Sequence, residues 1–404
     1  VTWGNSSSGG DSSGVDFSGG VRTIYSAKYA FAAIKNDGSV VTWGYSSYGG
    51  DSSGVDLSSG VNTIYSTGFA FAALKNDGSV VTWGRSASGG VSIGVNFSSG
   101  VRTIYSNPNA FAALKNDGSV VTWGDSSFGA DSSDVDFSGG VSTIYSNAYA
   151  FAALKNDGSV VTWGTSSNGG DSSGVDLSGG VRTIYSTDTA FAALKNDGSV
   201  VTWGFSSHGG DSSGVNFLGG VRTIHSTSVA FAALKYDGSV VTWGFSNAGG
   251  DSSGVDFSGG VRTIYSAKYA FAAIKNDGSV VTWGYSSYGG DSSGVDLSSG
   301  VNTIYSTGFA FAALKNDGSV VTWGRSASGG VSIGVNFSSG VRTIYSNPNA
   351  FAALKNDGSV VTWGDSSFGA DSSDVDFSGG VSTIYSNAYA FAALKNDGSV
   401  VTWG

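Results

Sequence analysis

The sequence contains no cysteine, methionine, glutamate or glutamine, and only two prolines and two histidines. The absence of cysteine excludes disulfides and thiol chemistry. Its apolar runs are only a few residues long, far short of the roughly 20 residues that a membrane-spanning helix needs. The net charge of −10 leaves no basic track for phosphate groups, so nucleic acid is not an expected partner. Without recurrent histidine or glutamate, the many serines have no base to activate them, and we expect no enzyme.

The composition still predicts an ordered protein. The chain has 65 glycines and abundant serine, yet 40% of its residues are hydrophobic and 13% are aromatic. One stretch, AFAALKNDGSVVTWG at residues 110–124, returns nearly unchanged ten times at a spacing of 40 residues. A fixed period of this length is typical of repeat proteins, in which each unit contacts mainly its two neighbours.

The recurring stretch predicts a β-hairpin with two apolar faces. Asn116 and Asp117 precede Gly118, which supplies the positive φ that a tight reversal needs. Side chains alternate between the faces of a strand, so Phe111 and Leu114 point to opposite sides, and both sides are apolar. A lone hairpin of this kind is unstable in water, and we therefore expect each copy to be stacked between two neighbours.

A further strand is predicted at residues 21–26, an alternating β-branched and aromatic run, and a fourth remains open around residues 15–17. No helix is predicted. The expected fold is all-β, with tandem 40-residue units of three to four antiparallel strands. The expected structural core includes Trp43, Trp83, Trp123, Trp163, Phe111, Leu114 and Gly118.

The domain organisation is predicted to be one continuous array over residues 1–404, made of ten repeats plus a four-residue overhang, without separate domains. Residues 249–404 duplicate residues 9–164 without a change, so a six-repeat period is superimposed on the 40-residue one. The overhang at residues 1–4 would be redundant in a closed ring. It favours an open superhelical stack over a closed ten-bladed propeller. It also suggests that the chain is a segment of a longer filament.

Variation between repeats collects in the loop after Trp-Gly and in the link before the hairpin. Aromatic residues occur at both places and are candidates for partner contacts: Tyr29, Tyr45, Tyr48, Phe69, Phe128, Tyr149 and Phe205. Loop aromatics of this kind stack on sugars or seat a partner chain, or else pack between neighbouring repeats.

Acidic loops are the candidate metal sites. Asp11, Asp16, Asp51 and Asp56 lie among glycines and serines, which suggests calcium as a weak possibility and turn capping as the alternative. The third repeat replaces these residues by Val91, Ile93 and Asn96, which argues against an obligatory ion in every repeat. The histidines, His208 and His225, lack a third ligand and are interpreted as surface substitutions.

The repeat resembles that of the regulator of chromosome condensation family. In the third copy the resemblance involves Val101, Ile104, Ala113, Leu114, Asp117, Gly118, Val120, Trp123 and Gly124. It implies blades of β-propeller type. Nucleotide exchange is not implied, because the second half-motif is replaced by Gly-Gly-Asp-Ser-Ser-Gly and no inserted wedge is present. The repeats are also similar to near-identical arrays in large bacterial surface proteins.

These features predict an extracellular or cell-surface structural array without catalytic activity, forming part of a filament, a stalk or a giant adhesive protein. Self-association with identical chains is expected, and a glycan or another cell-surface molecule is a further possible partner. The alternative is a closed propeller that binds glycan or protein through its aromatic loops.

Overall fold

The computed structural model describes residues 12–386 and 388–404. Its residues group into two compact units, Val1–Ser206 and Ser207–Gly404, and each unit is described by itself. Both are built from three-stranded antiparallel sheets, one in each 40-residue repeat, and none of the ten described sheets closes on itself. The predicted all-β architecture of tandem units is confirmed.

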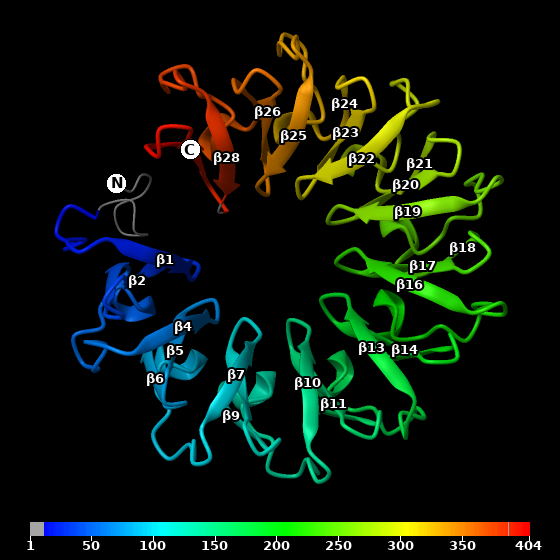
Figure 1. The fold of residues 1–404 in the computed structure, drawn as a ribbon. Coiled ribbons are helices and arrows are strands. Elements are labelled where there is room, and N and C mark those ends of the chain that lie inside the picture. The colour runs from blue at the N-terminus through cyan, green and yellow to red at the C-terminus, as the bar shows by residue number, and fades with distance from the viewer. Residues whose placement is uncertain (1–11, 387) are drawn as a thin grey trace. The chain divides into compact units, whose positions relative to one another are not determined.

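Figure 1 shows each repeat as a group of three strands, for example β4, β5 and β6. The first strands are β1 (Val21–Ser26), β4 (Val61–Ser66), β7 (Val101–Ser106), β10 (Val141–Ser146), β13 (Val181–Ser186), β16 (Val221–Ser226), β19 (Val261–Ser266), β22 (Val301–Ser306), β25 (Val341–Ser346) and β28 (Val381–Ser386). The central strands are β2 (Ala30–Lys35), β5 (Ala70–Lys75), β8 (Ala110–Lys115), β11 (Ala150–Lys155), β14 (Ala190–Lys195), β17 (Ala230–Lys235), β20 (Ala270–Lys275), β23 (Ala310–Lys315), β26 (Ala350–Lys355) and β29 (Phe391–Lys395). The third strands are β3 (Val40–Gly44), β6 (Val80–Gly84), β9 (Val120–Gly124), β12 (Val160–Gly164), β15 (Val200–Gly204), β18 (Val240–Gly244), β21 (Val280–Gly284), β24 (Val320–Gly324), β27 (Val360–Gly364) and β30 (Val400–Trp403).

Single-turn 3₁₀ helices follow the third strands, and the sequence did not predict them. They are η2 (Ser46–Tyr48), η3 (Ser86–Ser88), η4 (Ser126–Phe128), η5 (Ser166–Asn168), η6 (Ser206–His208), η7 (Ser246–Ala248), η8 (Ser286–Tyr288), η9 (Ser326–Ser328) and η10 (Ser366–Phe368). Three residues carry no 3.6-residue pattern, so propensity alone does not reveal such turns. Among residues 12–386 and 388–404, no helix has the length and hydropathy for a membrane span.

The segment around residues 15–17, left open as a fourth strand, is a loop. It precedes β1, and the ring of Phe17 meets the ring of Trp43 edge-on, with centroids 5.4 Å apart. Each described repeat therefore contributes three strands, and its connecting loop covers the tryptophan.

Both faces of each internal sheet are buried against neighbouring sheets of the same unit. In one such interface, Ala112 and Leu114 of the third repeat pack against Ile144, Phe151 and Trp163 of the fourth. The opposite face of the third sheet, which carries Phe111, packs against the second repeat. Burying a large apolar side chain contributes roughly 1.5 to 3 kcal/mol, so adjacent repeats stabilise each other.

Trp83 and the tryptophans that follow it along the chain also close the interface with a hydrogen bond. Trp163 is 4% exposed, stacks on Phe151 at 5.3 Å, and donates from Nε1 to the carbonyl of Gly129 in the preceding loop at 2.9 Å. The same bond recurs along the chain, for example from Trp83 to Gly49 at 3.0 Å. The buried indole N–H thereby has a partner, which avoids the cost of an unpaired donor.

The hairpin turn joins one repeat to the next. Gly118 has φ +83°, and a Cβ built there would lie 3.2 Å from the Cα of Gly140, so both conformation and space require glycine. The carbonyl of Gly118 accepts a hydrogen bond from Val141 N–H, at the start of the next sheet, at 2.9 Å.

Candidate functional site

The two variable segments of the repeat lie at the same end of each sheet. Ala30 at the start of β2 pairs with Gly44 at the end of β3, so the link before β2 and the loop after β3 are brought together. The asparagine-aspartate-glycine turns lie at the opposite end, because they connect β2 to β3. We call the first end the variable edge and the second the turn edge.

The variable edge has a fixed backbone beneath its changing side chains. Gly68 N–H donates to the carbonyl of Pro108 at 2.9 Å, and Lys28 N–H donates to the carbonyl of Gly68 at 3.1 Å, so the links of consecutive repeats are hydrogen-bonded. In the third repeat, buried Asn107 accepts from Ala110 N–H at 2.9 Å and donates to the carbonyl of Phe128 at 2.7 Å. Side chains at the remaining link positions can therefore vary without disturbing the strands.

One group of predicted contact residues forms an aromatic cluster in the first unit. We define the aromatic cluster as Tyr29, Tyr45, Tyr48 and Phe69, contributed by the link of the first repeat and by the loop and link of the second. Tyr48 is central, with ring centroids 4.8 Å from Tyr45, 5.6 Å from Tyr29 and 5.1 Å from Phe69. Tyr45 is 47% exposed. The residues predicted to contact a partner therefore pack against one another across two repeats.

Two cations border the aromatic cluster, and sequence reasoning did not assign them. Lys28 Nζ lies 5.4 Å from the centroid of Tyr29 and 5.9 Å from that of Phe69, and Arg85 Cζ lies 5.5 Å from Phe69. These distances are within the range of cation–π attraction. The available signal was that both basic residues lie in the same variable segments of the repeat as the aromatic residues.

The second unit carries the same set through the duplication. Lys268 and Arg325 border Tyr269 and Phe309 at 5.4 and 5.5 Å, respectively. The pair of tyrosines in its loop differs in orientation: Tyr285 and Tyr288 are T-shaped at 5.8 Å. Identical residues therefore support two arrangements of the exposed tyrosine.

The other predicted contact residues do not join the aromatic cluster. Phe128 stacks on Tyr149 at 5.4 Å, as a separate pair formed by the loop and link of the fourth repeat. Phe205 is 43% exposed at its own loop position. The aromatics are thus not one continuous surface.

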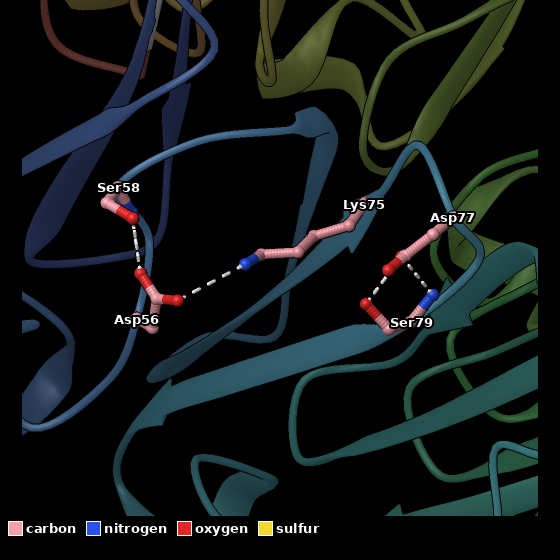
Figure 2. Close-up of polar contacts among 5 residues, drawn as sticks. All are labelled: Asp56, Ser58, Lys75, Asp77 and Ser79. Carbon is pink, nitrogen blue, oxygen red and sulfur yellow. Dashed lines mark hydrogen bonds and ion pairs between the residues drawn. The ribbon is translucent and has the colours of Figure 1, made fainter.

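The acidic loops are engaged in local turns. Figure 2 shows Asp56 accepting a hydrogen bond from the hydroxyl of Ser58 at 2.6 Å, while its other carboxylate oxygen lies 3.9 Å from Lys75 Nζ. Asp77, at the turn edge, accepts from the backbone N–H and hydroxyl of Ser79 at 2.9 and 2.6 Å. These bonds hold the pKa of both carboxyl groups below the ordinary value, with the serine hydroxyl as the main cause.

The remaining acidic candidates follow the same pattern. Asp51 accepts from Ser53 N–H at 2.9 Å, and Asp16 accepts from Ser18 N–H at 2.8 Å and lies 3.9 Å from Lys35. Asp11 lies outside the described residues. Among the described residues, no three acidic, histidine or cysteine side chains form a metal-binding group. The geometry is that of capped turns, the alternative considered above.

The interpretation of both histidines as surface substitutions is wrong for His225. It replaces the strand tyrosine whose hydroxyl meets a threonine of the next repeat, as Tyr65 meets Thr103 at 3.1 Å. His225 Nε2 is buried without a hydrogen-bond partner, and burial, with a smaller contribution from Arg222, lowers the pKa of the imidazole to about 4. His208 lies on η6, in another segment.

No family model matches the chain, and the search of curated proteins finds no relative. Among solved structures, the chain is similar to the ectodomain of the Physcomitrella patens receptor kinase CR4 (16% identity, 65% of this chain and 71% of that one, TM-score 0.38). It is also similar to Prp20p from Saccharomyces cerevisiae (16% identity, 56% and 72%, TM-score 0.35) and to the CRINKLY WD40 ectodomain of the Arabidopsis thaliana receptor kinase ACR4 (18% identity, 63% and 93%, TM-score 0.34). With TM-scores below 0.5, we transfer no arrangement of repeats, activity or partner from these proteins.

Proposed function

We propose that the chain is a structural repeat array that acts outside the cell, as a segment of a filament, stalk or surface adhesion protein, without catalytic activity. The observation that supports this most directly is the burial of both faces of each internal sheet against the preceding and following repeats of its unit. Such stacking adds length by adding units, since each interface is formed by the same residues. The open array is part of this proposal.

A chain lengthened in register tests the proposal. Residues 165–404 begin directly after one Val-Thr-Trp-Gly and end on another, so a second copy placed after Gly404 continues the pattern. The natural chain should be an elongated particle by small-angle scattering and electron microscopy, and the chain of 16 repeats should be about 1.6 times as long. Compact discs, or a length that does not grow with repeat number, would contradict the proposal.

A second candidate function, binding of glycan or protein, is favoured by the aromatic cluster. Tyrosine rings that are partly exposed beside cations suit stacking on sugar rings that carry acidic groups. A glycan array probed with the natural chain and with a variant carrying Tyr45→Ala, Tyr48→Ala, Tyr285→Ala and Tyr288→Ala tests it. The matched control carries Phe128→Ala and Phe368→Ala, which remove an aromatic pair without cations. Binding that survives the first variant unchanged, or no binding at all, would remove this candidate.

A further inference from the structure

The third repeat exposes apolar side chains where the other loops carry aspartate and serine. Its loop reads Val91-Ser92-Ile93-Gly94, whereas the second repeat has Asp51-Ser52-Ser53-Gly54. Ile93 is 94% exposed and Val91 is 45% exposed. Nothing in the stacking of the repeats uses the side chain of Ile93, because so exposed a side chain covers almost no neighbouring surface.

A groove of about 500 Å³ lies next to this loop in the same unit. One wall is formed by Ile93 and Val95 of the third repeat. Val120 and Val121 of the edge strand β9 also line it, and Phe137 lines it from the fourth repeat. An apolar projection therefore lies beside a recess in which valine and phenylalanine side chains alternate with asparagine, threonine and serine.

The same loop has lost negative charge. The positions of Asp51 and Asp56 are occupied by Val91 and Asn96, so two carboxylates are missing from this loop in a chain of net charge −10. Among the described residues that line the groove, Asp131 is the only acidic one, and its carboxylate accepts from Ser133 N–H at 3.0 Å. Repulsion between two acidic chains is thus weakest where the apolar surface is most exposed.

We call Val91, Ile93 and the groove beside them the isoleucine patch. We propose that this patch binds the isoleucine patch of a second copy of the same chain. A projection beside a recess is self-complementary, as a two-fold contact between identical chains requires. The duplication places the same loop at Val331 and Ile333, which are 45% and 94% exposed, so each chain carries two patches. Two patches per chain link copies into open-ended assemblies. This inference deepens the proposed scaffold function and rests on it.

Sedimentation velocity over a range of concentrations tests the proposal with variants that restore the loop of the other repeats. The first variant carries Val91→Asp and Ile93→Ser, and the second adds Val331→Asp and Ile333→Ser. Both introduce the Asp-Ser-Ser-Gly loop that this chain already folds in its second repeat. The natural chain should form species that grow with concentration, the first variant should stop at dimers, and the second should stay monomeric. The association constant of an altered patch should fall at least about tenfold, because its isoleucine is no longer there to be buried in the contact.

Salt dependence and a control variant separate this contact from general stickiness. Association through the isoleucine patch should strengthen as salt screens the acidic chains, whereas charge-driven association would weaken. Leu218→Ser, which removes a leucine that is 79% exposed in another loop, should leave the assembly unchanged. A natural chain that is monomeric at every concentration, or a double-loop variant that still assembles, overturns the proposal. These substitutions should not change how the length of a single chain grows with the number of repeats. The particle-length measurement therefore tests the scaffold proposal independently of this one.

Discussion

The connecting loops of the repeats adopt two forms, and the difference depends on one residue. In the leucine form the backbone carbonyl of Leu57 accepts from Val40 N–H on the preceding edge strand at 3.0 Å, and the side chain is 5% exposed. In the phenylalanine form the carbonyl of Phe97 instead accepts from Gly100 N–H at 3.1 Å, inside its own loop. The leucine form closes on the neighbouring sheet, whereas the phenylalanine form closes on itself and directs its ring to the tryptophan.

The backbone follows the same division. Ser99, in a phenylalanine loop, has φ +75°, and Gly139 at the equivalent position has φ +83°. Neither Ser59 nor Gly179, in leucine loops, has a positive φ, although glycine is free to adopt one. Hydrogen bonding between repeats therefore decides the loop conformation. The φ of the glycine at this position depends on that conformation, and not the reverse. The groove of the isoleucine patch is bordered by the phenylalanine loop of Phe137. In that loop the carbonyl of Phe137 accepts a hydrogen bond from Gly140 N–H.

The largest expected effect concerns the tryptophan that both loop forms cover. Trp123→Ala should lower the free energy of unfolding of its neighbourhood by about 3 to 5 kcal/mol, since it removes a buried ring and leaves a cavity. The Trp123→Ala variant also loses the edge contact between Trp123 and Phe97, whose ring centroids are 5.3 Å apart. Such a contact contributes roughly 0.5 to 1.5 kcal/mol beyond the burial of apolar area. Trp83 packs against Leu57 instead and has no such contact to lose. Urea unfolding and limited proteolysis of the Trp123→Ala and Trp83→Ala variants should rank them in that order. Equal losses would mean that the loop form does not matter to the core.

A conversion of loop forms should cost less. Leu57→Phe places a larger side chain in a closed loop, and we expect a loss of about 1 to 3 kcal/mol from overpacking and from opening of the Val40 hydrogen bond. Amide hydrogen exchange at Val40 reports the opening directly. The reciprocal change, Phe97→Leu, should leave exchange at Val40 unchanged. If Leu57→Phe leaves the Val40 amide as protected as before, the leucine is not what selects the loop form.

Opposite signs are expected for one glycine substitution in the two forms. Ser99→Gly should stabilise the protein by a few tenths of a kcal/mol up to about 1 kcal/mol, because the turn requires a positive φ there and the hydroxyl that is lost meets only the solvent-exposed carboxylate of Asp117. Ser59→Gly should destabilise by roughly 0.4 to 1 kcal/mol, because it only adds freedom to the unfolded chain. Thermal unfolding of the two single variants measures both. If the two substitutions change the stability in the same direction, the division into two loop forms is contradicted.

The smallest expected difference is in the titration of the turn aspartates. The Ser119 hydroxyl and N–H, joined by the Ser99 hydroxyl, lower the pKa of Asp117 to about 2, whereas the pKa of Asp77 is lowered without a serine from the preceding loop. Because the folded-state pKa of Asp117 is below its ordinary value, its stabilising contribution is complete above about pH 4 and disappears as the pH falls towards 2. Carboxyl chemical shifts followed by NMR should show Asp117 titrating below Asp77. Ser99→Gly should raise the Asp117 midpoint and leave that of Asp77 unchanged.

Much of the fold was predictable from local patterns. Strand periodicity and Gly118 predict the hairpin, and the apolar side chains on both faces predict stacking, as the packing of Leu114 and Phe111 against different neighbours confirms. The single-turn helices were not predictable, since Gly49, which ends one of them, has φ +102° and leaves no room for a side chain beside Phe71 of the following sheet. The burial of His225 was missed because it depends on the strand position rather than on residue type.

The sequence by itself determined the elements that depend on nearby residues: the alternation within strands, the turn residues between them and the 40-residue period that makes every interface alike. Only the tertiary structure decided which backbone N–H would donate to the carbonyls of Leu57 and Phe97, and that Tyr29, Tyr48 and Phe69 would meet across two repeats. The physical reason is that strands and turns arise from interactions within a few residues. The loop forms and the aromatic cluster depend on partners about 20 to 40 residues away, which come within hydrogen-bond and ring-stacking distance only after the sheets have packed.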